Sequence, residues 1–88
     1  MKLIIAIVRD VDNDPVSHKL TATGFRVTTV ASTGGFLRRG QTTMLIGLPD
    51  ERLEEALNII RQNVTRSTEP GVKSATIFVI KVDEFIQF

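Results

Sequence analysis

The feature that most constrains this fold is a strand-like segment that is apolar on both faces. Leu3–Val8 reads LIIAIV, as is typical of a strand in the centre of a sheet. Ala75–Ile80 reads ATIFVI and is nearly as apolar. A chain of 88 residues is expected to cover only one face of such a sheet with helices, so a monomer would expose an unusually large apolar patch. We therefore expect a homo-oligomer whose sheets face inward, with clefts between subunits that suit ligands.

The remaining elements follow from periodicity and from turn residues. A first helix is expected from Asp14, which caps its start, through Pro15 to Gly24. The other expected elements, in chain order, are a strand Phe25–Ala31, a loop Ser32–Gly40, a strand Gln41–Leu48, a helix from Pro49 to Val64, a connection Thr65–Ser74 and a strand Ala75–Val82. This order is βαββαβ. It predicts an α+β, ferredoxin-like domain over residues 1–88, with two helices on one face of a four-stranded antiparallel sheet.

Composition argues against several classes of protein. The net charge of +1 does not favour general binding to nucleic acid or to a membrane surface. No cysteine is present, and a single His18 cannot form a multi-histidine site, so no metal is expected. The apolar run at Leu3–Val8 is short and is followed at once by Arg9 and Asp10, which argues against a signal peptide and for a cytoplasmic protein. No nucleophile or catalytic triad is apparent, so no catalytic residue is assigned.

The segment Ser32–Gly40, STGGFLRRG, carries the clearest chemical signal. Its glycines let backbone N–H groups approach an anion, and its arginines supply charged donors. Phe36 in such a loop can stack on a nucleobase. The alternative is a glycine-rich hairpin whose Phe36 and Leu37 plug the neighbouring subunit.

Residues on two strands favour a bound ligand over a hairpin that packs into the neighbouring subunit. Alternation along Phe25–Ala31 places Arg26 and Thr28 on the face that must meet a partner, where a cation pairs with a carboxylate or holds an anionic ligand. Gly47, on the facing strand, leaves room for a ligand to approach, although a strand bulge would also explain a glycine there.

Three blocks of this sequence resemble the PII-like cyclic-di-AMP receptor family. They are MKLIIAIV at the start, FRVT followed by STGGFLR over residues 25–38, and VDEFIQF at residues 82–88. The resemblance implies a bacterial, cytosolic homotrimer for signal transduction, without enzymatic activity, that binds one cyclic-di-AMP in each cleft between subunits. It further implies these ligand-binding residues: Arg26, Thr28, Gly35, Phe36, Leu37, Arg38, Gln41, Gly47, Phe78 and Gln87.

The chain departs from the family pattern at two places. Gln41 stands where asparagine is common, and it offers the same donor and acceptor groups one methylene further out. Between the second helix and the last strand the family usually has a long flexible loop, thought to respond to ligand and to meet a downstream protein. In this chain the connection is only Thr65–Ser74. Two alternatives stay open: a trimeric protein-interaction module that has lost the nucleotide, and a small phosphate or acyl-phosphate hydrolase that uses Gly34–Arg38 as an anion cradle.

Overall fold

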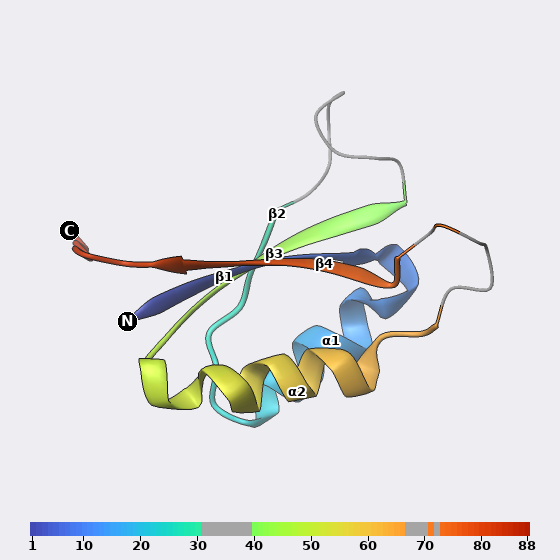
Figure 1. The fold of residues 1–88 in the computed structure, drawn as a ribbon, viewed down its shortest axis with the longest axis horizontal. Helices are drawn as coiled ribbons and strands as arrows, with labels where there is room; N and C mark the ends of the chain where they lie inside the picture. Colours follow the sequence, from blue (N-terminus) through green and yellow to red (C-terminus); the bar gives the residue numbers. More distant parts are fainter. Residues whose placement is uncertain (31–39, 67–70, 72) are drawn as a thin grey trace.

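A strand near the N-terminus occupies the centre of the sheet. The computed structural model describes residues 1–30, 40–66, 71 and 73–88. The elements are β1 (Lys2–Arg9), α1 (Asp10–Ala22), β2 (Thr28–Val30), β3 (Gln41–Leu48), a 3-10 turn η1 (Asp50–Arg52), α2 (Leu53–Asn63) and β4 (Ala75–Lys81). The sheet order is β2-β3-β1-β4 with antiparallel pairing throughout, and both helices lie on one face (Figure 1). The ferredoxin-like prediction is confirmed.

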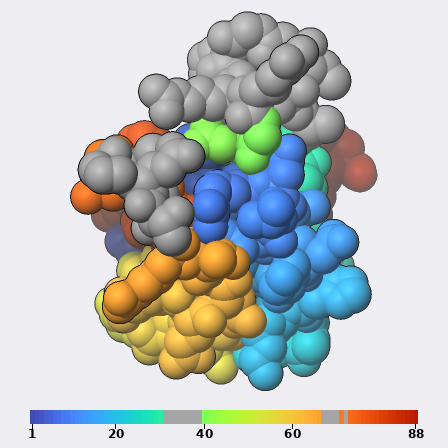
Figure 2. Space-filling model, turned by 90° about the vertical axis from the view of Figure 1, so that its right-hand side faces the viewer, coloured from blue at the N-terminus to red at the C-terminus, as the bar shows by residue number. Residues whose placement is uncertain are grey.

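The core lies between the sheet and the two helices. Alternate residues of β1 and β3 point toward the helices and are buried, as are the apolar stripes of both helices. These residues are Ile4, Ala6, Val8, Met44, Ile46, Leu48, Val16, Leu20, Ala56, Ile59 and Ile60. Figure 2 shows α1, in blue, and the yellow and orange end of α2 packed side by side under the sheet.

The other face of the sheet, here called the open face, carries apolar side chains that no described helix covers. In the register, Leu3 lies between Gly47 and Ile80, and Ile5 lies between Leu45 and Phe78. Phe78 and Ile80 are 53% and 44% exposed. By the same register, this face also includes Thr28, Val30, Thr43, Ile7 and Thr76. Among the residues that the structure describes, no helix covers the apolar second face expected from the sequence.

The first helix begins five residues earlier than predicted, so the assignment of Asp14 as its cap is wrong. Residue Arg9 occupies the capping position and makes no capping hydrogen bond through its side chain. The helix starts at Asp10 because Asp10 and Asp12, in its first turn, find partners far away in the sequence at Gly40 and Thr65. Carboxylates in a first turn also suit the positive end of a helix.

Other boundaries differ less. β2 begins at Thr28 rather than at Phe25, because Phe25 still belongs to the turn that ends α1, where its N–H donates to the Leu20 carbonyl. The expected end of this strand, Ala31, lies outside the described residues. The second helix opens with the turn η1 and ends at Asn63, one residue before Val64. Across the described ranges, no helix is long and apolar enough to cross a membrane.

Candidate functional site

A hollow of about 490 Å³ opens on the open face, at the end of the sheet where β1 begins and β3 ends. The segment after β4 borders it, since the Val82 N–H donates to the Met1 carbonyl at 3.0 Å and leads the chain past the start of β1. The lining residues are Met1, Leu3, Arg26, Thr28, Leu45, Gly47, Val82, Phe85 and Gln87. Its size is in the range of small-molecule pockets.

The turn between α1 and β2 determines where Arg26 lies. Gly24 takes a φ of 98°, which glycine adopts without strain, and Phe25 then enters the core at 5% exposure. Arg52 closes over this turn: its guanidinium lies 4.0 Å from the centre of the Phe25 ring and donates to the Thr23 carbonyl at 3.0 Å. Because Phe25 points inward, Arg26 is presented on the open side, next to Thr28, which pairs with Leu45 of β3.

The hollow combines free polar groups with apolar walls. Arg26 and Gln87 are exposed, and neither makes a hydrogen bond or an ion pair with any residue that the structure describes. A guanidinium suits phosphate, and a primary amide both donates and accepts, as the edge of a nucleobase does. Leu3, Leu45 and Phe85 supply apolar surface against which a planar group can pack. The arrangement suits a ligand that is both anionic and planar.

Gly47 keeps the hollow open. A Cβ atom at this position would lie 3.2 Å from the terminal methyl carbon of Met1, closer than side chains normally pack. The backbone end of Met1 is fixed, because its α-amino group forms an ion pair with the Asp50 carboxylate at 2.9 Å. The hydrogen bond from this amino group, with the charges of Lys2 and Lys81 nearby, lowers the pKa of Asp50 below its ordinary value.

The structure brings four of the ten predicted site residues to this hollow: Arg26, Thr28, Gly47 and Gln87. Phe78 shares the open face but lies on β4, at the opposite edge of the sheet from β2. Gln41 lies six residues before Gly47 on β3, about 20 Å along the strand. The remaining four, Gly35, Phe36, Leu37 and Arg38, fall outside the described residues.

Five lining residues were not among the predicted ones: Met1, Leu3, Leu45, Val82 and Phe85. The alternation of β1 and β3 contained the signal for Leu3 and Leu45, since both share a face with Gly47. Phe85 belongs to the same terminal block as Gln87. Met1 carries no local pattern that would have pointed to the hollow.

Comparison with known proteins shows the family to which the chain belongs. A sequence profile of the family described as cyclic-di-AMP receptor matches residues 1–70. Among solved structures, a crystal structure of a functionally unknown protein from Pediococcus pentosaceus ATCC 25745 is 38% identical, with a TM-score of 0.81. The alignment covers 99% of this chain and 96% of that one. The profile spans most of the chain, including β1, β2 and β3, and we conclude that the chain belongs to the cyclic-di-AMP receptor family.

Proposed function

We propose that this protein is a PII-like signal-transduction receptor that binds cyclic-di-AMP and catalyses no reaction. The observation that carries the proposal is the hollow on the open face, where Arg26 and Gln87 have no partner among the described residues. Membership of the cyclic-di-AMP receptor family supplies the class of ligand. The described lining includes no carboxylate and no histidine, so it offers no general base for a hydrolase.

The chemistry of the ligand matches these groups. Cyclic-di-AMP has two phosphodiester charges and two adenines, so it needs cations, amide groups and surfaces for stacking. In our proposal Arg26 pairs with a phosphate and Gln87 hydrogen-bonds an adenine edge, while Thr28 and Gly47 border the site. Gly35, Phe36, Leu37 and Arg38 would enclose an adenine and its phosphate, and Gln41 follows this loop directly in the chain.

We further propose a homotrimer with the ligand between subunits. β3 is antiparallel to both β1 and β2, so β1 and β2 run in the same direction. β4 is antiparallel to β1, so the two edge strands β2 and β4 run in opposite directions. The β4 edge of one copy can therefore approach the β2 edge of the next in a closed ring. Such a ring covers the open faces and brings Phe78 toward the neighbouring copy's hollow, which accounts for its distance from Arg26 within one chain.

Isothermal titration calorimetry with cyclic-di-AMP, cyclic-di-GMP and ATP tests the ligand. We expect cyclic-di-AMP to bind at one site per subunit, more tightly than the other two nucleotides. Multi-angle light scattering of the same sample should give three times the 9.8 kDa mass of one chain. Absence of binding with all three nucleotides would remove the receptor proposal, and a monomeric mass would remove the trimer.

The second candidate is a trimeric module that meets a downstream protein and has lost the nucleotide. The short connection Thr65–Ser74 and Gln41, which both depart from the family pattern, favour it. Thermal unfolding distinguishes the two functions, because a ligand at a hundred times its Kd stabilises the native state by about 2.7 kcal/mol. A melting temperature that no nucleotide changes would favour the interaction module.

A further inference from the structure

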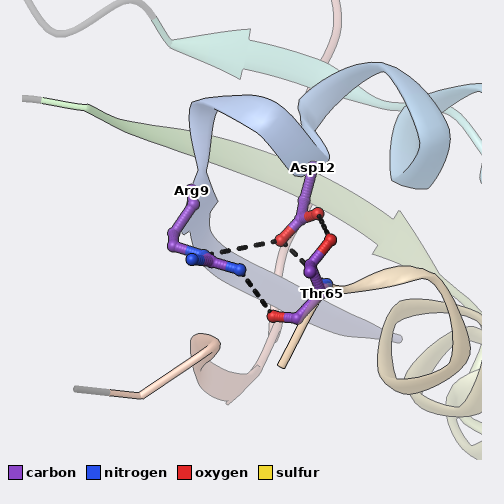
Figure 3. A network of polar contacts seen from close by, with 3 residues as sticks. All are labelled: Arg9, Asp12 and Thr65. Carbon is purple, nitrogen blue, oxygen red and sulfur yellow. Dashed lines mark hydrogen bonds and ion pairs between the residues drawn. The ribbon is translucent and has the colours of Figure 1, made fainter. Parts of the chain in front are cut away.

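A buried carboxylate fixes the first residue after the second helix. Asp12 is 1% exposed, and its two oxygens accept hydrogen bonds from Thr65, from the hydroxyl at 2.7 Å and from the backbone N–H at 3.1 Å (Figure 3). Arg9 completes the group: its terminal nitrogen donates to the Thr65 carbonyl at 2.7 Å, and its Nε lies 3.8 Å from Asp12. We call Arg9, Asp12 and Thr65 the Asp12 clasp. It holds Thr65 by its N–H, its carbonyl and its hydroxyl.

The same short segment also holds the start of β3. The Asp10 N–H donates to the Gly40 carbonyl at 2.8 Å, and the Thr42 hydroxyl donates to the Asp10 carboxylate. In the sheet, Arg9 is paired with Gln41. Figure 2 shows the blue start of α1, the green start of β3 and the orange segment after α2 meeting at this end of the molecule. Residues 9–12 therefore contact Gly40–Thr42 on one side and Thr65 on the other.

The hydrogen bonds of the Asp12 clasp are expected to form or to break together. A carboxylate buried to this degree is costly unless its hydrogen bonds are made, and removing one partner leaves the remaining charge poorly compensated. Asp10 and Asp12 share the rigid first turn of α1, so a displacement of Gly40–Thr42 acts on Asp12 through a single turn of helix. Residues 9–12 therefore connect Thr65 structurally to Gln41, although 24 positions separate these two residues in the sequence.

We propose that the Asp12 clasp couples nucleotide occupancy at Gln41 to the position of Thr65, with Asp12 and Thr65 as positioning residues that do not touch the ligand. The inference rests on the proposed function, because it takes Gln41 and the loop before it as part of the nucleotide site. An intact clasp preorganises Gly40–Thr42 for binding, and by linkage the bound nucleotide strengthens the clasp.

The test uses the full chain and three variants. Thr65→Val removes the hydroxyl donor with little change in shape, and Thr65→Ser retains it. Asp12→Asn preserves the size of the buried group while removing its charge. Calorimetry gives the affinity for cyclic-di-AMP, and amide hydrogen exchange followed by NMR gives the protection of the Thr65 N–H with and without nucleotide. We expect Thr65→Val and Asp12→Asn to weaken binding by about three- to tenfold, which is the usual worth of one hydrogen bond.

In the wild type, we also expect cyclic-di-AMP to slow exchange of the Thr65 amide, and Thr65→Ser to bind within about twofold of wild type. A purely structural clasp would lower the melting temperature of Thr65→Val but leave its affinity, and the exchange response of the wild type, unchanged. If the affinity of Thr65→Val, or the amide exchange of the wild type with nucleotide, is unchanged, the coupling is wrong. The receptor proposal still holds in that case, provided that the wild type binds cyclic-di-AMP. If the wild type itself binds no cyclic-di-AMP, the receptor proposal and the coupling both fail.

Discussion

Arg26 owes its access to the hollow to its neighbour Phe25, which is buried and fixes the direction in which the next side chain leaves the backbone. We predict that Arg26→Ala weakens cyclic-di-AMP binding by about ten- to a hundredfold, since a charge-assisted hydrogen bond contributes roughly 1.5–3 kcal/mol. Calorimetric titration measures the loss. Arg61→Ala is the matched control, because Arg61 is exposed on α2, outside the hollow, and hydrogen-bonds only to Asn58 among the described residues. Equal affinities in both variants would place the anion site elsewhere.

The second prediction for a single residue concerns Gly47, which has no side chain to fill the hollow. Gly47→Val should fill part of the hollow and weaken binding by about five- to a hundredfold, the equivalent of roughly 1–3 kcal/mol of overpacking. Gly47→Ala should have a smaller effect. The melting temperature should stay close to that of the wild type, because the atom that Cβ would meet is the flexible end of Met1 and valine favours strands. Tight binding by Gly47→Val would show that the ligand does not enter the hollow.

At the scale of elements, the pair between Met1 and Asp50 joins the start of β1 to η1. The pKa of Asp50 is lowered from 3.8 in the folded chain, so the pair stabilises the native state fully above pH 3.8. This contribution is lost as the pH falls through the lower folded-state pKa. We predict that Asp50→Asn lowers the melting temperature by at most a few degrees at pH 7, since the pair is exposed.

Thermal unfolding of the wild type and of Asp50→Asn, from pH 7 down to pH 2, measures how the contribution of the ion pair depends on pH. The difference between wild type and Asp50→Asn should shrink below about pH 3.8, and it should also shrink in high salt. A difference that grows on acidification would contradict the assignment.

The elements show what local patterns can and cannot predict. The open-face alternation of Leu3, Leu45 and Gly47 follows from spacing alone and agrees with the structure. The true start of α1 does not follow from spacing, because the partners of Asp10 and Asp12 lie 30 or more residues away and only the folded chain brings them together. β2 begins later than its alternation predicts, because the preceding residues complete the turn after α1.

The candidate site divides in a similar way. Alternation predicted that Arg26 and Thr28 share a face, and the resemblance to the family added Gln87, which is far away in sequence. The lining of the hollow by Met1 depends on where the chain after β4 crosses the start of β1, and no local pattern encodes such a crossing.

At the scale of the whole molecule, the uncovered apolar face is the feature that an assembly must resolve. We predict that Phe78→Glu converts the proposed trimer to monomers, since it places a charge next to Ile5 and Ile80 on the open face. It should also abolish cyclic-di-AMP binding, because the proposed site needs two subunits. Light scattering and calorimetry on one sample measure both effects. Val11→Glu serves as the control, since Val11 is 72% exposed on α1, and a trimeric Phe78→Glu protein would contradict the proposed interface.

The position of β1 between β3 and β4 has a consequence for how the chain is made. Ile5 pairs with Phe78, so the central strand leaves the ribosome about 70 residues before its second neighbour exists. At typical rates of synthesis that interval is roughly 4–14 s, far longer than local collapse takes. Throughout it, a strand apolar on both faces has at least one unpaired edge, and such an edge favours aggregation. We therefore expect the newly synthesised chain to be most exposed to aggregation before residues 75–81 emerge.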